Sequence, residues 1–433
     1  MGGGMLDKFF RLSEHDTTVG TEVLAGLTTF LTMAYIIFVN PSILAKAGMD
    51  QNAVFVATCV AAAIGTLIMG LYANYPVAMA PGMGLNAFFT FGVVGGMGHT
   101  WQVALGAVFL SGLIFLGLSI LPVREWIINS IPKSLKLAIG AGIGLFLGMI
   151  GFQSAGLTVD HPATLVDVGK LTQPTVLLAA LGFVLAVVLS VRKVPGALIL
   201  SILIVAAIGW ITGLATFNGI AAMPPDPSPT FLQMDVKGAM DVALISVIFA
   251  FLFVDLFDTA GTLVAVGLRA KLIGEDGKLP RLDRALIADS TATVAGAVMG
   301  TSTTTSYIES IAGINAGGRT GLTAVTTGIL FLAALFLAPL ATSIPAFATA
   351  PALIFVACLM VQGLADLEWD DLTEVAPAVI TAIAMPFTFK IADAIGMGFI
   401  AFAVIKLATG KSDQINAAVW TIAAAAVAKF IWL

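Results

Sequence analysis

Charge, cysteine and histidine are all scarce in this sequence. Lys, Arg, Asp and Glu make up 10% of its 433 residues, against about 25% in soluble domains, which excludes an ordinary soluble protein. The two cysteines, Cys59 and Cys358, lie far apart in separate apolar segments and form no redox or metal-binding spacing. The histidines His15, His99 and His161 do not cluster either. We therefore expect no metal site and no cofactor.

Apolar residues, by contrast, are abundant. They make up 59% of the chain, and the mean hydropathy is +1.03. Apolar runs of about 17–25 residues, the length of a helix that crosses a bilayer, recur from one end to the other. The sequence therefore predicts an all-α polytopic membrane protein embedded in a lipid bilayer. The expected spans lie near residues 23–40, 53–73, 77–94, 101–121, 134–152, 175–191, 196–215, 240–266, 285–300, 302–316, 321–340, 348–364, 372–389 and 391–408, with a last apolar stretch at 416–432.

The two halves of the chain repeat one pattern. In each half a short interrupted segment, at 75–89 and at 299–313, precedes a pair of spans joined by Ser-Ile-Pro. Seven spans separate equivalent elements, so we expect the halves to be inverted-topology repeats. The predicted organisation is a cytoplasmic N-terminus (1–22), a first inverted repeat (23–222), an extracytoplasmic linker (223–239), a second inverted repeat (240–410) and a C-terminal apolar segment (411–433).

Basic residues test this topology independently. With the N-terminus inside, most of the twenty Lys and Arg, among them Arg124, Lys271 and Lys278, fall on cytoplasmic segments. We expect a multi-pass protein of the cytoplasmic (inner) membrane. The basic loop 267–284 is typical of a solvated connection, so we expect no nucleic-acid partner.

Acidic residues inside spans are costly and therefore mark functional positions. Asp255 and Asp258 lie well inside the span 240–266. At 100° per residue they share an arc of about 100° with Thr259 and Thr262, which predicts one inward-facing polar stripe. Asp255 is also consistent with a purely structural acid that bonds a neighbouring helix.

The most polar segment, TSTTTSYIES (301–310), contains a third such acid, Glu309. We expect residues 301–305 to be extended, because a run of Thr and Ser fits poorly in a regular helix. The helix would begin near Ser306, and Thr305 and Ser306 would lie one turn before Glu309 on the same face.

The matching break in the first half is MAPGMGLNAFF (79–89). Pro81, Gly82 and Gly84 interrupt it, and Asn86 supplies an amide directly afterwards. Non-helical backbone at membrane depth is tolerated only where it is buried or lines a cavity. Two such segments that cross would present backbone groups and helix N-termini to one central site. Alternatively, the Thr and Ser residues only join helices, as small polar residues do in membrane bundles.

Five motifs stand out along the chain: AGLTTFLTMAYIIFVNPSIL (25–44), APGMGLNAFF (80–89), DLFDTAGTL (255–263), TSTTTSYIESIAG (301–313) and GGRTGLTAV (317–325). Together they resemble the nucleobase:cation symporter-2 superfamily, and within it the AzgA-like purine permeases. The resemblance implies about fourteen transmembrane segments in two inverted seven-span repeats that form a core and a gate domain. The third and tenth segments would be part strand and part helix, with the substrate between them. By analogy with this fold we expect a homodimer.

By this resemblance, Asp258, which lies within DTAG, and Glu309 are the residues expected to bind the base. The other residues expected at the substrate are Asn86, Gly84, Thr259, Thr305 and Ser306. The candidates for carrying a coupled proton are Asp258, Glu309 and Asp255.

The resemblance, together with the intramembrane acids, implies a proton-coupled symporter that imports purine nucleobases, adenine before guanine or hypoxanthine. The sequence shows no Ser/His/Asp order, no HExxH and no paired histidines, so we expect no enzyme and no catalytic residues. One alternative is an anion transporter or channel of the same fold, which two site acids disfavour. Another is a Na⁺-coupled nucleobase transporter, because threonine oxygens and unwound carbonyls also bind Na⁺.

Overall fold

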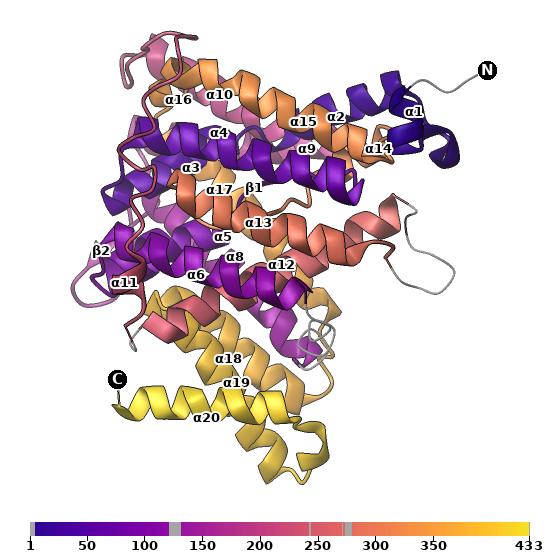
Figure 1. The fold of residues 1–433 in the computed structure, drawn as a ribbon. Helices are drawn as coiled ribbons and strands as arrows, with labels where there is room; N and C mark the ends of the chain where they lie inside the picture. The colour runs from indigo at the N-terminus through magenta and orange to yellow at the C-terminus, as the bar shows by residue number, and fades with distance from the viewer. Residues whose placement is uncertain (1–4, 121–130, 242–243, 271, 273–278, 433) are drawn as a thin grey trace.

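The computed structural model is almost entirely helical (Figure 1). Arg124, Lys271 and Lys278, whose placement the sequence predicts, lie outside the described part of the chain. The predicted all-α membrane fold is confirmed. The described residues are 5–120, 131–241, 244–270, 272 and 279–432.

Most helices follow one another with short connections, but a long one, residues 212–235, joins α10 to α11. The η elements are short 3₁₀ or π helices. The first half contains α1 (Met5–Phe10), η1 (Leu12–His15), α2 (Val19–Met33), α3 (Ile36–Leu44), η2 (Ala45–Ala47), α4 (Gln51–Ile68), η3 (Met69–Ala73), β1 (Met79–Pro81), α5 (Met83–Ala87), η4 (Phe88–Gly96), α6 (Trp101–Ile120), α8 (Lys133–Ser154), β2 (Thr158–His161), β3 (Leu165–Val168), α9 (Pro174–Val191) and α10 (Ala197–Ile211). The second half contains α11 (Val236–Ala239), α12 (Ile245–Arg269), α13 (Leu282–Met299), β4 (Thr304–Ser306), α14 (Ser310–Asn315), α15 (Gly321–Ala334), η6 (Leu335–Leu337), α16 (Ala338–Ser343), α17 (Ala346–Val361), η7 (Gln362–Asp366), α18 (Leu372–Thr388), α19 (Ile391–Ala408), η8 (Ser412–Gln414) and α20 (Ala417–Trp432).

Most of the predicted spans are each formed by one long apolar helix. Shorter apolar helices cover Met83–Gly96, Ala197–Ile211, Leu372–Thr388 and Ala417–Ile431. Helix α13 is less apolar than its neighbours because Asp289 and several Ser and Thr residues interrupt it. Among the described residues, nine stretches are long and apolar enough to cross a membrane: Val19–Ala47, Gln51–Ala73, Trp101–Ile120, Lys133–Ser154, Pro174–Val191, Ile245–Gly267, Gly321–Ser343, Ala346–Asp366 and Ile391–Ala408.

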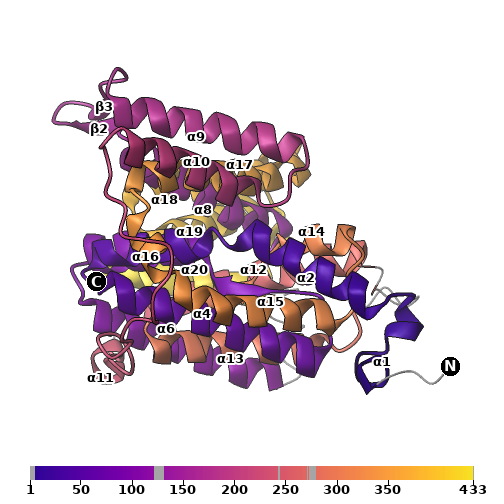
Figure 2. The same cartoon turned by 90° about the horizontal axis from the view of Figure 1, so that it is seen from above.

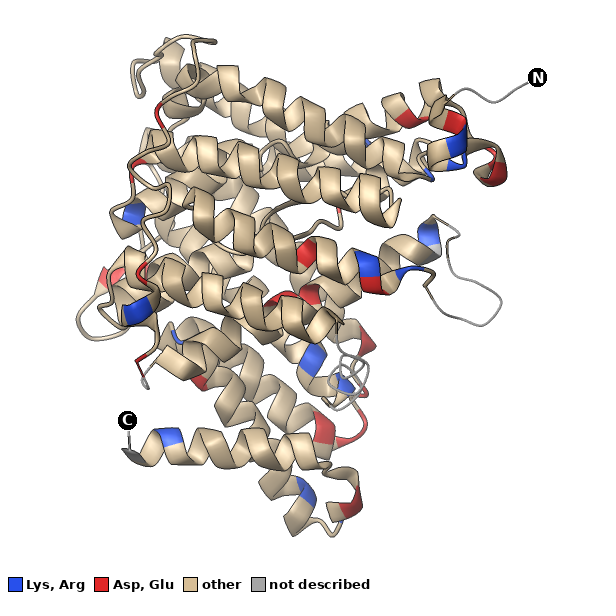
Figure 3. Cartoon of the chain, viewed as in Figure 1, with Lys and Arg blue, Asp and Glu red and all other residues tan. Residues whose placement is uncertain are grey.

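The helices form two bundles, and each bundle draws on both halves of the chain (Figure 2). In the first bundle, α15 packs on α2 and α4, α13 packs on α4 and α6, and α12 packs on α6. In the second bundle, α8 packs on α17 and α18, α9 packs on α10 and α17, and α19 packs on α18 and α20. Charged side chains are few along the helices, although acidic ones also occur at mid-length (Figure 3).

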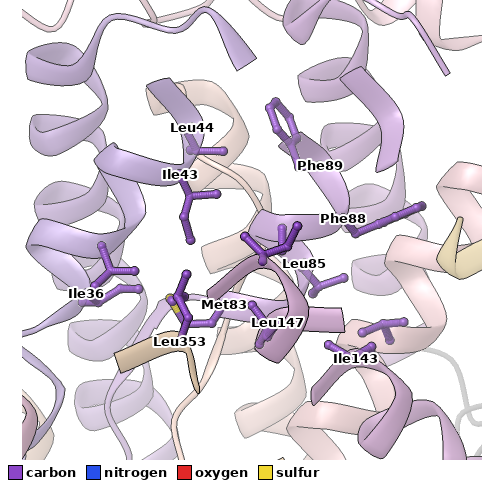
Figure 4. Close-up of a cluster of buried hydrophobic side chains, with 14 of the residues drawn as sticks. Ile36, Ile43, Leu44, Met83, Leu85, Phe88, Phe89, Ile143, Leu147 and Leu353 are labelled. Atoms are coloured by element: carbon purple, nitrogen blue, oxygen red, sulfur yellow. The ribbon is translucent and has the colours of Figure 1, made fainter. Parts of the chain in front are cut away.

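Apolar side chains fill the seam between the two bundles (Figure 4). On one side lie residues of α3 and α5, including Ile43 and Leu85, and on the other lie Ile143 and Leu147 of α8 and Leu353 of α17. Such contacts are non-directional, because the hydrophobic effect depends on buried area rather than on specific pairs. A seam of this kind therefore holds the bundles together without fixing a single register.

A buried acid ties together two helices of the first bundle. Glu22 of α2 is fully buried, and its carboxylate accepts N–H groups of Arg319, Thr320 and Thr323 at the start of α15. The Thr323 hydroxyl also donates to it at 2.6 Å. A helix N-terminus has unpaired N–H groups and a positive dipole end, so this carboxylate is fully satisfied without a cation.

Two short strands pair within the first bundle, where they contact α4, α12 and α13, in agreement with the strands predicted for the third and tenth segments. β1 and β4 pair antiparallel, with Met79 opposite Ser306 and Pro81 opposite Thr304. A second hairpin, β2 with β3, connects α8 to α9 and was not foreseen from the sequence.

The helix after β4 begins later than predicted. The sequence indicated a helix from Ser306, but Ser306 is the last residue of β4 and α14 starts at Ser310. Pairing with β1 is the reason, because Ser306 lies opposite Met79 and the Tyr307 N–H donates to the Ala78 carbonyl at 2.9 Å. The predicted helical face shared by Thr305, Ser306 and Glu309 is therefore wrong.

Candidate functional site

The backbone of both interrupted segments is satisfied across the strand pair. The Gly82 N–H donates to the Thr303 carbonyl at 2.8 Å, and the Tyr307 hydroxyl donates to the Pro81 carbonyl at 2.5 Å. Thr66 of α4 bonds both the N–H and the carbonyl of Met79. Extended backbone at membrane depth is stable only with such hydrogen-bond partners. The non-helical backbone of these two segments is therefore stabilised by the fold itself.

Helix α12 presents a polar face to this strand pair. Asp255 and Thr259 are buried, and the Thr259 hydroxyl lies 2.8 Å from the hydroxyl of Thr305 on β4. Asp258 is exposed although it lies near the middle of a 25-residue helix, and Gly261, one turn later, faces open space. Accessible space therefore reaches this face of α12.

Glu309 lies in the turn between β4 and α14, where it is half-buried. Its Oε1 accepts a hydrogen bond of 2.8 Å from the hydroxyl of Tyr35. Asp258 lies within electrostatic range of Glu309 and beside Thr305. The structure thus brings together the two acids that the sequence placed at the substrate, on elements about fifty residues apart.

A second pair of acids lies behind β4. Asp255 accepts a bond of 2.9 Å from Thr293 of α13, whose hydroxyl is also 3.0 Å from the Thr304 carbonyl. Asp289 of α13 accepts a bond of 3.0 Å from Ser306. The two carboxyls are electrostatic neighbours, both are buried, and each keeps one oxygen without a hydrogen-bond partner among the described residues.

None of these four carboxyls forms an ion pair within the described part of the chain. The ion pairs there involve the acids Glu14, Asp371, Glu374 and Asp393. An ionised carboxylate that is buried without a cation is strongly disfavoured. The two buried acids, Asp255 and Asp289, therefore depend on hydrogen bonds from hydroxyl groups, and the two accessible acids, Asp258 and Glu309, can bind a ligand that supplies hydrogen-bond donors.

Two other predicted residues lie in α5. Asn86 is fully buried, and neither its amide nitrogen nor its amide oxygen has a partner among the described residues. Gly84 packs against α8, since a Cβ there would be 2.1 Å from the Ile143 side chain. Gly84 is thus placed at the contact between the bundles, and its role at the substrate stays a prediction.

Sequence reasoning missed Tyr35 and Asp289. Tyr35 lies in an apolar span, where a sequence alone does not distinguish it from an ordinary core aromatic residue. Asp289 lies near the predicted start of the span 285–300, where an acid suggests a solvated helix end. Only the packing of α13 against β4 shows that Asp289 belongs to the interior.

Comparison with known proteins is consistent with this geometry. Residues 20–396 match the model of the Permease family, Xan_ur_permease. The adenine permease AdeP of Escherichia coli K12 is 49% identical over 100% of this chain and 97% of its own length. The guanine/hypoxanthine permease PbuG of Bacillus subtilis is 47% identical over 98% of this chain and 99% of its own length.

Solved structures share the fold at low identity. The transmembrane domain of the cyanobacterial bicarbonate transporter BicA is 15% identical and superposes with a TM-score of 0.64, over 88% of this chain and 97% of that domain. SLC26A9 is 10% identical with a TM-score of 0.65, over 94% of this chain and 68% of that protein. Full-length identity to several permeases, together with the family match, shows that this chain belongs to the nucleobase:cation symporter-2 family.

Proposed function

We propose that this protein is a proton-coupled symporter that imports purine nucleobases, adenine first and guanine or hypoxanthine next, across the cytoplasmic membrane. The observation that carries the proposal is the pair of accessible carboxyls, Asp258 and Glu309, which lie within electrostatic range of each other beside the paired strands β1 and β4 and form no ion pair in the described part of the chain. The names of the relatives, adenine permease and guanine/hypoxanthine permease, support the substrate class.

A purine base fits the chemistry of these groups. It is planar and apolar on its faces, and its edge carries both hydrogen-bond donors and acceptors. Carboxylates accept its N–H groups, and a protonated carboxyl donates to its ring nitrogens. The buried amide of Asn86 supplies both a donor and an acceptor that the protein leaves unused. A site built from polar groups that are otherwise unpaired discriminates strongly against ligands lacking the matching groups.

Proton coupling follows from the same lack of cations. Four carboxyls lie close to β4, two accessible and two buried, and none is neutralised by Lys or Arg in the described part of the chain. Protonation from outside would remove the charge cost, and release to the inside would reset the site. Each proton contributes about 2.3 kcal/mol per 100 mV of membrane potential, which is enough to drive substantial accumulation.

The two ends of the seam between the bundles support alternating access. At one end, Lys46 of the first bundle donates to Ser154 of the second at 2.8 Å, and the backbone near Gly92 packs on the Phe389 carbonyl. On the other side of the site, exposed residues continue along α12 from Asp258 towards its C-terminal end, which includes Val264. We propose that the first bundle is the core domain, which moves against the second, the gate domain.

The same proposal includes orientation and assembly. The bias of Lys and Arg supports a cytoplasmic N-terminus, which makes the C-terminal end of α12 the inner end and this conformation open to the inside. Inverted repeats at 23–222 and 240–410 account for the antiparallel pairing of β1 with β4. A homodimer is part of the proposal by analogy with the fold.

Two alternative functions, anion transport and Na⁺-coupled nucleobase transport, also have an observation in their favour. The fold is shared with a bicarbonate transporter and an anion transporter, yet acids at the site oppose anion binding. Buried oxygens of Asn40, Ser302 and Thr304 have no partner in the described part of the chain, and such oxygens suit Na⁺. Na⁺ coupling is therefore the second candidate.

The test is uptake of labelled adenine, guanine and hypoxanthine in cells that lack their own purine permeases. We expect accumulation of at least one purine that collapses with a protonophore and persists when Na⁺ is replaced by choline. Accumulation that needs Na⁺ and survives the protonophore would transfer the coupling to Na⁺. No purine uptake by well-expressed protein, with uptake of bicarbonate instead, would overturn the substrate class.

A further inference from the structure

Tyr35 reaches the candidate site from a part of the chain that the proposed function does not use. It lies between α2 and α3, where bonds from residue i to i+3, such as Phe38 N–H to the Tyr35 carbonyl, replace the regular helical pattern. Its side chain is 1% exposed and packs in the main apolar core, while its hydroxyl donates to Glu309 Oε1 at 2.8 Å.

This hydrogen bond distinguishes the two oxygens of Glu309. A phenol has one proton to donate, and here it points at Oε1. If Glu309 is protonated, its own proton must therefore reside on Oε2, because a proton on Oε1 would compete with the phenol. No other side chain in the described part of the chain donates to Glu309, so Oε2 is left for a ligand or for water.

We propose that Tyr35 is a positioning residue that makes Oε2 the single atom of Glu309 that takes the coupled proton and contacts the purine. This inference rests on the proposed function. A proton from the outer side binds Oε2, which then donates to a ring nitrogen. When the site opens inward the proton leaves to water, and the ionised Oε2 no longer has a hydrogen to donate. Tyr35 keeps its own proton throughout.

Two measurable properties depend on this arrangement. The first is affinity, because a carboxyl without its anchoring bond rotates and must be ordered again when the purine binds. The second is the pH at which uptake is half-maximal, because a hydroxyl that donates to a carboxylate stabilises the ionised form. Removing the Tyr35 hydroxyl favours the protonated form of Glu309. Uptake that requires this form therefore persists to a higher pH.

The experiment is Tyr35→Phe, which keeps the ring and its packing. We expect the KM for the transported purine to rise about tenfold, in line with the cost of ordering one freed side chain on binding, and the pH midpoint of uptake to move upward. Melting of the purified protein and its elution in gel filtration report whether the variant is folded.

Tyr307→Phe is the matched control. Tyr307 is also buried, but its hydroxyl donates to a backbone carbonyl instead of a carboxyl. We expect it to lower the melting temperature and leave the pH midpoint where the unmodified protein has it. Tyr72→Phe, on an exposed ring, is expected to change neither.

The outcomes separate the two proposals. If the unmodified protein transports no purine, the proposed function fails. If it transports purine and folded Tyr35→Phe has an unchanged pH midpoint and KM, Tyr35 does not position Glu309 and only this inference is overturned. An equal shift in Tyr35→Phe and Tyr307→Phe would also overturn it, because both would then act through the fold.

Discussion

Two groups of acids inside the bundles differ in what faces them. In the second bundle, Lys406 of α19 is fully buried and lies 2.6 Å from Glu374 of α18. Lys429 of α20 lies 2.5 Å from Asp393 of α19. At the site in the first bundle, Asp255, Asp289 and Glu309 accept hydrogen bonds from hydroxyl groups, and none of these acids, nor Asp258, forms an ion pair among the described residues.

We propose that this difference separates structural acids from functional ones. A buried acid that joins helices is satisfied by a cation, as Glu374 is, or by a helix N-terminus, as Glu22 is. Breaking such a partnership leaves an uncompensated charge and destabilises the fold. An acid without any such partner is poised for a proton or a ligand. Removal of the first kind should lower stability, and removal of the second kind should lower transport.

The largest effect is expected from the site acids. Asp258→Asn and Glu309→Gln keep the size of each side chain but remove the titratable group. We expect purine uptake to fall about a hundredfold or more, because a buried polar mismatch is poorly tolerated. The melting temperature should stay the same or rise, since the amides carry no buried charge. Uptake near the unmodified level in either variant would contradict the assignment of that acid.

A smaller effect, and one on a different property, is expected from Lys406→Met. It leaves Glu374 without its cation, and we expect the free energy of unfolding to fall by about 3–5 kcal/mol, as for other broken buried pairs. The double variant Lys406→Met/Glu374→Gln should recover part of that loss. Thermal unfolding of the purified protein measures both. If Lys406→Met melted normally but shifted the pH dependence of uptake, the division into two groups of acids would be wrong.

The smallest effect concerns Asp371, at the start of α18. Hydrogen bonds from Thr373 and from Lys411 hold the pKa of the Asp371 carboxyl well below its usual range. A lowered pKa means that Asp371 contributes stability above the ordinary value of about 4, and this contribution is lost as pH falls below it. Asp371→Asn should therefore lose less thermal stability than the unmodified protein between about pH 5 and pH 3. Equal losses would show that Asp371 does not matter for acid stability.

Only part of the candidate site could be predicted from the sequence. Costly intramembrane acids identified Asp258 and Glu309 in advance, because burial of a charge leaves a signal in any apolar run. Tyr35 left no such signal, since an aromatic residue in an apolar span is ordinary core. Strand pairing was also hidden, because the pairing of Thr304 with Pro81 depends on a segment more than two hundred residues away.

Hydropathy and the position of acids already determined that this chain crosses a membrane many times and interrupts two of its segments. Both properties are local, because each span must bury its own backbone and each acid has its own cost in lipid. Tertiary structure alone decided which acids meet lysines, which meet only hydroxyls, and that Tyr35 binds Glu309. Those partnerships join residues far apart in the chain, and they depend on how the helices pack.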